Sequence, residues 1–78
     1  MDLKERIIAE KDEIKADIVR LKTRIEKLEM KIKAAENKAV EIAEEPLKLM
    51  KEQIEHMKNA LEHLEKYYET LKKRLEKL

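Results

Sequence analysis

Few side chains in this sequence could carry out chemistry, and their spacing does not assemble a metal site. His56 and His63 are the only histidines and lie seven residues apart, which places them on one face of a helix, two turns from each other. Chelation by a single helix favours a spacing of four, which Glu52 and His56, or Asn59 and His63, provide. A carboxylate-bridged site in a bundle also needs a Glu-x-x-His motif on facing helices, and none is present. We therefore predict surface histidines, with no metal and no cofactor.

Catalytic groups are equally scarce. The chain contains no serine and no cysteine, and its only hydroxyls besides the tyrosines belong to Thr23 and Thr70. Without glycine, a Gly-rich phosphate loop cannot form. The numerous carboxylates are spread over helix faces expected to be solvated, where little would perturb their pKa values. The sequence predicts that the chain is not an enzyme.

The overall charge and the shortage of aromatic residues exclude further classes of function. Lys and Arg number 19 against 18 Asp and Glu, and this near balance argues against a duplex-binding face. Tyr67 and Tyr68 are the only aromatic residues, too few to stack the bases of a single strand. No stretch approaches the roughly 20 apolar residues of a membrane span, and the N-terminus does not resemble a signal peptide. We expect a soluble, cytoplasmic chain with neither a nucleic-acid nor a membrane partner.

Apolar residues in the first half of the chain recur with the spacing of a coiled coil. Their steps alternate between three and four residues, apart from a gap at Lys11. In a heptad lettered a to g, such steps fill positions a and d, and several consecutive heptads predict a coiled-coil helix. The a positions are Lys11, Ile18, Ile25, Ile32 and Ala39, and the d positions are Ile7, Ile14, Leu21, Leu28, Ala35 and Ile42.

The second half repeats the pattern without a gap. Ala60 and Tyr67 at g positions widen its apolar stripe, and a stripe of this width is typical of a helix bundle rather than a two-stranded zipper. The a positions are Leu47, Ile54, Leu61, Tyr68 and Leu75, and the d positions are Met50, Met57, Leu64, Leu71 and Leu78.

The two heptad patterns slip by one residue at Pro46. Proline clashes with the preceding turn inside a helix but is well tolerated at the first position of a new one. We therefore predict a single coiled-coil domain, 1–78, with helices over 2–44 and 46–78 and a turn near 43–46. The fold class is all-α, an antiparallel helical hairpin. One long helix kinked at the proline is the alternative, because the turn contains no Gly, Asn, Ser, Thr or Asp to cap either helix.

A hairpin folded at this turn pairs each a position with a d position on the other helix. The predicted pairs include Ile42 with Leu47, Ala39 with Met50, Ile32 with Met57, Leu21 with Tyr68, and Ile18 with Leu71. This register places Lys11 opposite Leu78 and leaves residues 1–10 without a partner in the chain. The core-position lysine is interpreted as partly exposed near a frayed helix end, rather than as a device that fixes the register.

The overhang and the open side of a two-helix hairpin predict self-association. Two hairpins would most simply form a four-helix bundle, so a homodimer is favoured. The residues predicted to form the self-association interface are Ile7, Ile14, Ile18, Leu21, Ile25, Leu28, Ile32, Ile42, Leu47, Met50, Ile54, Met57, Leu61, Leu64, Tyr68, Leu71 and Leu75.

Three hypotheses for the function remain open at this point. The first is a non-catalytic structural or oligomerisation module that pairs through its heptad faces. The second is an interaction module that binds a different helical protein. The third is an engineered helical bundle without a natural function: the absence of glycine and the full-length heptads fit design, whereas the uncapped turn and the core lysine fit a natural sequence better.

Overall fold

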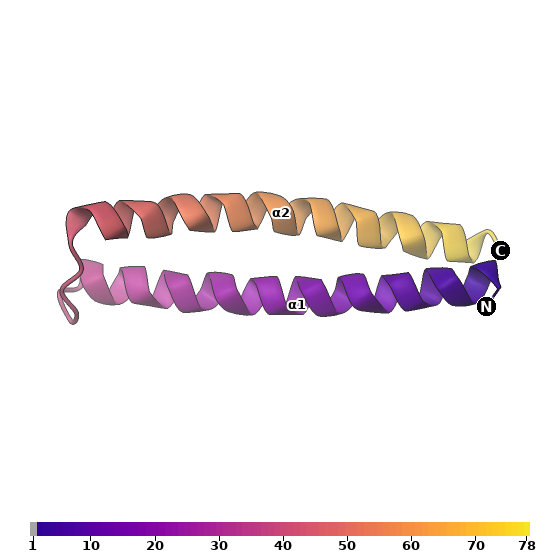
Figure 1. Cartoon of the computed structure of the whole chain (residues 1–78), viewed down its shortest axis with the longest axis horizontal. Coiled ribbons are helices and arrows are strands. Elements are labelled where there is room, and N and C mark those ends of the chain that lie inside the picture. Colours follow the sequence, from indigo (N-terminus) through magenta and orange to yellow (C-terminus); the bar gives the residue numbers. More distant parts are fainter. Residues whose placement is uncertain (1) are drawn as a thin grey trace.

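The chain folds into two antiparallel helices that lie side by side along their whole length (Figure 1). The computed structural model describes residues 2–78, with α1 at Leu3–Glu36 and α2 at Glu44–Glu76. The hairpin measures 54 × 16 × 15 Å, and both termini lie at the end opposite the loop. The predicted helical hairpin is confirmed, and the single kinked helix is excluded. Neither helix contains a stretch long and apolar enough to cross a membrane.

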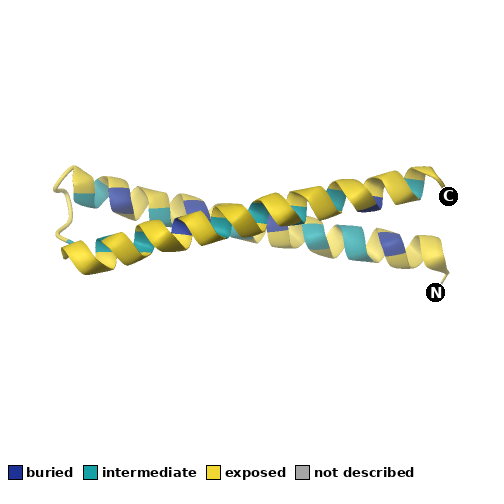
Figure 2. Cartoon of the chain, turned by 90° about the horizontal axis from the view of Figure 1, so that it is seen from above, coloured by how far each residue is buried: buried dark blue, intermediate teal, exposed yellow. Residues whose placement is uncertain are grey.

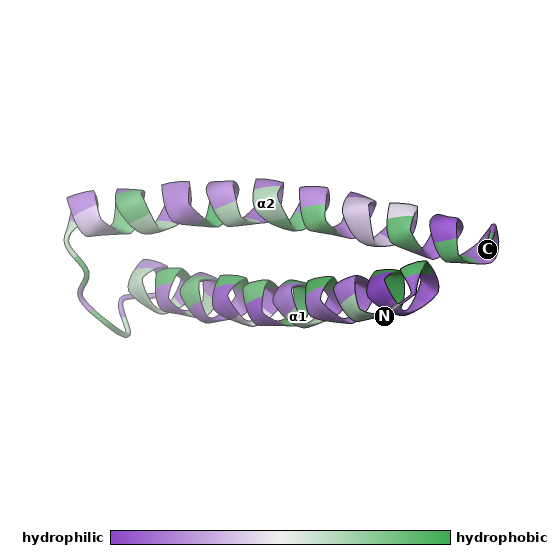
Figure 3. Cartoon of the chain, turned by 45° about the vertical axis from the view of Figure 1, so that its right-hand side comes forward, coloured by the Kyte–Doolittle hydropathy of each residue, from purple (hydrophilic) through white to green (hydrophobic). Residues whose placement is uncertain are grey.

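A single hydrophobic seam holds the helices together. In Figure 2, seen from above, the helices cross at a shallow angle, and the buried residues lie along the line where they meet. Figure 3 shows the same seam as the apolar inner side of each helix. Apolar residues spaced three and four apart produce this arrangement, because they keep one side of each helix turned toward the other. The buried residues are Ile7, Ile18, Ile25 and Ile32 of α1, with Ile54 and Leu71 of α2.

Helix α1 begins at a conventional cap and ends in a motif that the sequence prediction missed. The Asp2 side chain accepts a hydrogen bond from the Glu5 backbone N–H at 2.8 Å, which satisfies one of the free donors of the first turn. At the other end, the backbone N–H of Lys38 donates to the Ala35 carbonyl and that of Ala39 donates to the Ala34 carbonyl. These two bonds define a Schellman motif, which ends a helix by turning one residue into the left-handed region.

The predicted end of the first helix, at residue 44, is therefore wrong, as is the predicted turn near 43–46. The helix ends at Glu36, and residues 37–43 form the loop. The loop begins at Asn37, and Lys38 adopts the left-handed conformation with φ of 60°. Ala39 and Ile42, counted as heptad positions from the sequence, lie in this loop instead of in the paired helices.

Helix α2 begins two residues earlier than predicted, at Glu44. Pro46 is its third residue, where the missing N–H would have had no partner within the helix in any case. Ala43 precedes the helix and provides no side-chain cap. Glu44 and Glu45 partly compensate, because negative charge in the first turn interacts favourably with the helix dipole.

The helices pair one heptad away from the predicted register. The Lys11 ammonium lies 6.0 Å from the centre of the Tyr68 ring. In the predicted register Tyr68 would lie opposite Leu21, roughly 15 Å along the helix from Lys11 at 1.5 Å per residue. The observed contact fits a register that still pairs a with d but places Ile25 opposite Met57 and Ile18 opposite Leu64.

The shifted register removes the predicted overhang. Ile7 would have lain beyond the end of the second helix, yet it is only 3% exposed, and Leu71 is 1% exposed. The loop explains this shift in register. Its seven residues were predicted to extend the first helix, so the helix is about one heptad shorter at the turn than predicted. The start of α1 is then drawn level with the end of α2. The N-terminal segment is thus part of the hairpin seam, although Leu3 and Ile8 on its flanks remain exposed.

The left-handed Lys38 provides a test of the loop. A residue with a Cβ pays about 1 kcal/mol to adopt this conformation, whereas glycine adopts it freely. Lys38→Gly is therefore expected to raise the free energy of unfolding by about 0.5–1 kcal/mol. Lys33→Gly, inside the last turn of α1, is the matched control and should destabilise by about 1 kcal/mol. Urea unfolding followed by circular dichroism measures both, and destabilisation by Lys38→Gly would contradict the observed end of the helix.

Candidate interaction surface

The residues considered for metal binding lie exposed on α2. His56 and His63 are both solvent-accessible, as is Glu52. Within residues 2–78, no group of three or more His, Cys, Asp or Glu side chains could hold a metal ion. The chemistry that the molecule offers is therefore that of its surfaces, and the most informative surface is the edge of the seam.

The hairpin leaves more area exposed than a compact chain of its mass does. A folded monomer of 9.4 kDa typically exposes about 5,000 Å². This chain exposes 6387 Å². The elongated shape of the hairpin contributes to this excess, and so do the edges of the apolar stripe, because two helices can cover only one side of each other's stripe.

The residues predicted to self-associate divide into two groups. One group is buried in the seam between the helices: Ile7, Ile18, Ile25, Ile32, Ile54 and Leu71. The other group is half-buried and keeps part of its apolar surface at a seam edge: Ile14, Leu21, Leu28, Ile42, Leu47, Met50, Met57, Leu61, Leu64, Tyr68 and Leu75. Only the second group, apart from the loop residue Ile42, offers seam surface to another molecule.

One edge of the seam is bordered by e positions of opposite charge, and we call it the paired-charge face. Lys51 Nζ lies 3.4 Å from Glu36 Oε1 across this edge. The same register places Glu29 opposite Lys58 and Lys22 opposite Glu65, and only the last pair toward the termini, Lys15 with Lys72, has like charges. The residues of the paired-charge face are Lys22, Glu29, Glu36, Lys51, Lys58 and Glu65.

These charges distinguish the observed register from the predicted one. Sliding the helices by one heptad preserves every a-with-d layer, so the apolar pattern cannot choose between the two. The observed register has three opposite-charge pairs and one like pair, Lys15 with Lys72. The slide would keep one opposite-charge pair and create two like pairs, Glu29 with Glu65 and Lys22 with Lys72, which is destabilising. The e positions therefore carried a signal in the sequence that the analysis of a and d positions missed.

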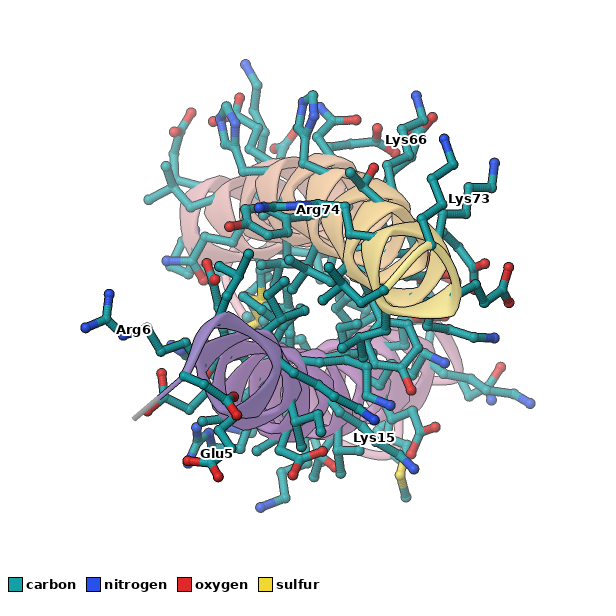
Figure 4. All side chains as sticks on the ribbon, turned by 90° about the vertical axis from the view of Figure 1, so that its right-hand side faces the viewer. Glu5, Arg6, Lys15, Lys66, Lys73 and Arg74 are labelled. Carbon is teal, nitrogen blue, oxygen red and sulfur yellow. The ribbon has the colours of Figure 1, made fainter. Side chains whose placement is uncertain are left out.

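The opposite edge is bordered by c and g positions, and we call it the histidine face. An open groove of about 480 Å³ on this side is lined by residues of both helices: Arg24, Lys27, Leu28, Gln53, His56 and Met57. Figure 4 looks along the hairpin and shows Arg6, at a c position, extending to one side while Lys15, at an e position, lies toward the other. The two edges are thus separate surfaces.

The histidine face differs sharply between the two helices. Along α2 its row carries no ammonium, guanidinium or carboxylate over seven consecutive positions: Leu49, Gln53, His56, Ala60, His63, Tyr67 and Thr70. Along α1 its row begins with Leu3 and Arg6. An acidic stretch then precedes a basic one: Glu10, Glu13 and Asp17, then Arg20, Arg24, Lys27 and Lys31. The sequence alone did not show that these two rows lie on the same surface, because that depends on how the helices pair.

Two tyrosines connect the helices near the termini. The Tyr67 hydroxyl donates a hydrogen bond to the Glu10 carboxylate across the histidine face. Tyr68 lies in the seam, with Lys11 and Lys72 at 6.0 and 5.9 Å from its ring centre, close enough for cation–π attraction. Lys11 is partly exposed, as predicted for this core-position lysine, but it lies within α1 beside this ring and not at a frayed helix end.

The Tyr67–Glu10 contact changes the titration of the tyrosine. Its hydrogen bond to Glu10 raises the pKa of Tyr67 above 10.0, and desolvation and the Glu10 charge add to the rise. A raised pKa in the folded state stabilises the hairpin below pH ~10, and this contribution is lost as the pH rises through the folded-state pKa. The contact therefore favours the folded chain at neutral pH.

The raised pKa of Tyr67 can be measured directly. In Tyr68→Phe protein, Tyr67 is the only phenol, and its ultraviolet absorbance near 295 nm reports its ionisation. We expect the titration midpoint to fall when Glu10→Gln is added, because the acceptor charge is lost. Glu13→Gln, one turn along α1, is the control and should leave the midpoint nearly unchanged. A midpoint insensitive to Glu10→Gln would show that the contact does not form in solution.

The register can be tested by a double-mutant cycle. Glu29→Lys and Lys58→Glu each place like charges in register and should destabilise the hairpin by a few tenths of a kcal/mol, while the double swap restores stability. Urea unfolding at low salt gives the coupling energy. The control cycle combines Glu29→Lys with Glu65→Lys, which face each other only in the predicted register. Coupling in the control cycle and not in the first would establish the other register.

Comparisons with other proteins give no family for the chain. No protein-family model matches it, and neither curated proteins nor solved structures include a match. The function is therefore inferred from the chain's own surfaces.

Proposed function

We propose that this chain is a non-catalytic structural module that self-associates through the open edge of its heptad seam, most simply as a homodimer that forms a four-helix bundle. The observation that carries this proposal is how little the hairpin buries: only six apolar residues of 2–78 are buried, and 6387 Å² stays exposed. Two-helix hairpins of this size rarely bury enough apolar surface to be stable alone, and oligomerisation is the usual remedy in the absence of disulfides or metal.

Half-buried seam residues support the same proposal. Leu28 and Met57 keep apolar surface in the groove of the histidine face, where a neighbouring helix could cover it. Packing two hairpins together would complete the layers that a single hairpin leaves open. The near-zero net charge of +1 imposes little repulsion between copies.

A second candidate function is binding to a different helical protein. An open, mostly apolar pocket of about 500 Å³ lies where the loop folds against the helices, and it could accept a large apolar side chain from such a partner. The residues lining it are Met30, Lys31, Ala34, Val40, Ile42 and Met50. In this case the chain alone would remain a monomer until the partner was added.

Sedimentation equilibrium of the purified chain separates the two candidates. We expect the apparent mass to rise with concentration from 9.4 kDa toward twice that value. Circular dichroism on the same samples confirms that the chain is folded. A folded chain that stays at the monomer mass across the concentration range would contradict self-association and favour the second candidate.

A further inference from the structure

We propose that the partner is a second copy of this chain, docked through the histidine face with the two loops at opposite ends of the dimer. This inference rests on the self-association proposed above and specifies its surface and orientation. In this arrangement a two-fold axis crosses the middle of the hairpin, so α1 runs antiparallel to α1 of the second copy, and α2 to its counterpart.

The charges of α1 on this face are complementary to themselves. Reversing the helix about Arg20 brings each acidic residue opposite a basic one of the second copy. Arg20 itself would lie near the axis, where its charge is balanced within its own chain by Asp17 at 2.6 Å. The facing pairs are Glu10 with Lys31, Glu13 with Lys27, and Asp17 with Arg24. Each copy would contribute every pair once, so the dimer would contain six such contacts.

The row of α2 on this face meets its own copy without charge repulsion. Ala60 lies at the middle of α2 and Arg20 near the middle of α1, so in the observed register the two are nearly level and both rows can share one axis. A small side chain at the axis lets the two α2 helices approach closely. On either side of it, His56 faces His63 of the second copy, and Gln53 faces Tyr67. No residue between Leu49 and Thr70 in this row would be forced against a like charge at neutral pH.

The ends of the hairpin also match under this operation. Leu3 is 55% exposed on the histidine face at the terminal end of α1. The antiparallel arrangement brings it to the loop end of the second copy, close to the apolar pocket that contains Ala34 and Met50. The exposed leucine and the open pocket would therefore cover each other.

The size of the face suits a stable dimer. The hairpin profile of 54 by 15 Å corresponds to roughly 800 Å² on one side, which is about the area each partner buries in a typical specific interface. The alternative with both loops at one end would pack α1 against the uncharged row of α2. That arrangement would remove the α1 charges from water without giving them partners, which is costly.

The paired-charge face is a poorer candidate for the same contact. Its charges already face one another within the hairpin, as Glu36 and Lys51 do at 3.4 Å. Val19 is the exposed apolar residue on this side; it lines an open pocket of about 310 Å³ with Ile18 and Tyr68, but charged side chains surround the pocket: Lys15, Lys22, Glu65 and Glu69.

Charge reversal tests the proposed surface in the full chain. Glu13→Lys with Asp17→Lys makes the α1 row wholly basic apart from Glu10, and Arg24→Glu with Lys27→Glu makes it mostly acidic. Each variant alone should dimerise at least about tenfold more weakly than the unaltered chain, because like charges then face each other. An equimolar mixture of the two should recover a heterodimer near the original affinity.

Matched controls change the net charge equally on the other side of α1. Asp12→Lys with Glu26→Lys, and Lys15→Glu with Lys33→Glu, should leave the dimer affinity within about threefold of the original. Sedimentation equilibrium measures all the variants, and circular dichroism confirms that they fold. Equal weakening by the controls, or no recovery in the mixture, would overturn the proposed surface.

Orientation is tested separately by a single spin label in the loop. The chain has no cysteine, so Asn37→Cys introduces one labelling site per copy. Electron–electron distance measurements should give a separation close to the 54 Å length of the hairpin. A dimer with a short separation, below about 25 Å, would refute the antiparallel orientation while leaving self-association intact. A monomer would refute the proposed function itself.

Discussion

The structure depends on the pairing of two amphipathic helices along one seam. Among residues 2–78 six apolar side chains are buried, and all of them belong to that seam. No disulfide or metal ligand cluster supplements it within residues 2–78. Because so little apolar surface is buried, each layer of the seam supplies a larger share of the free energy of folding than it would in a larger core. Small electrostatic differences can therefore decide between alternative pairings of the helices.

The fold class followed from the a and d positions, whereas the register did not. Heptads predict two long helices and an apolar seam, and they permit any slide that preserves a-with-d layers. Glu29 and Lys22 at e positions remove that degeneracy, because the slide would place each of them opposite a like charge; the loop that starts at Asn37 acts in the same direction. The loop was missed because Lys38 occupies a conformation usually assigned to glycine, and Pro46 drew attention to a boundary that lies inside α2.

The seam is not uniformly apolar, and its polar members are concentrated near the termini. Lys11 occupies a core position beside Tyr68, and Tyr67 reaches across to Glu10 on the neighbouring edge. A lysine in this layer suits the observed register, because its ammonium is attracted to the face of the Tyr68 ring while its methylene chain packs against the seam. In the predicted register Lys11 would instead lie opposite Leu78, roughly 15 Å along the helix from Tyr68 at 1.5 Å per residue.

Register within the hairpin and geometry between hairpins are coupled. The proposed two-fold axis requires the centre of the α1 charge pattern, at Arg20, to lie level with Ala60 on α2. A slide by one heptad would separate these centres by about 10 Å at 1.5 Å per residue, so that a single axis could no longer satisfy both rows. The charges of the paired-charge face fix the register, and they thereby align the two rows of the histidine face on which the proposed contact depends. The paired-charge face would determine how the two helices align, and the histidine face would bind the second copy in that alignment.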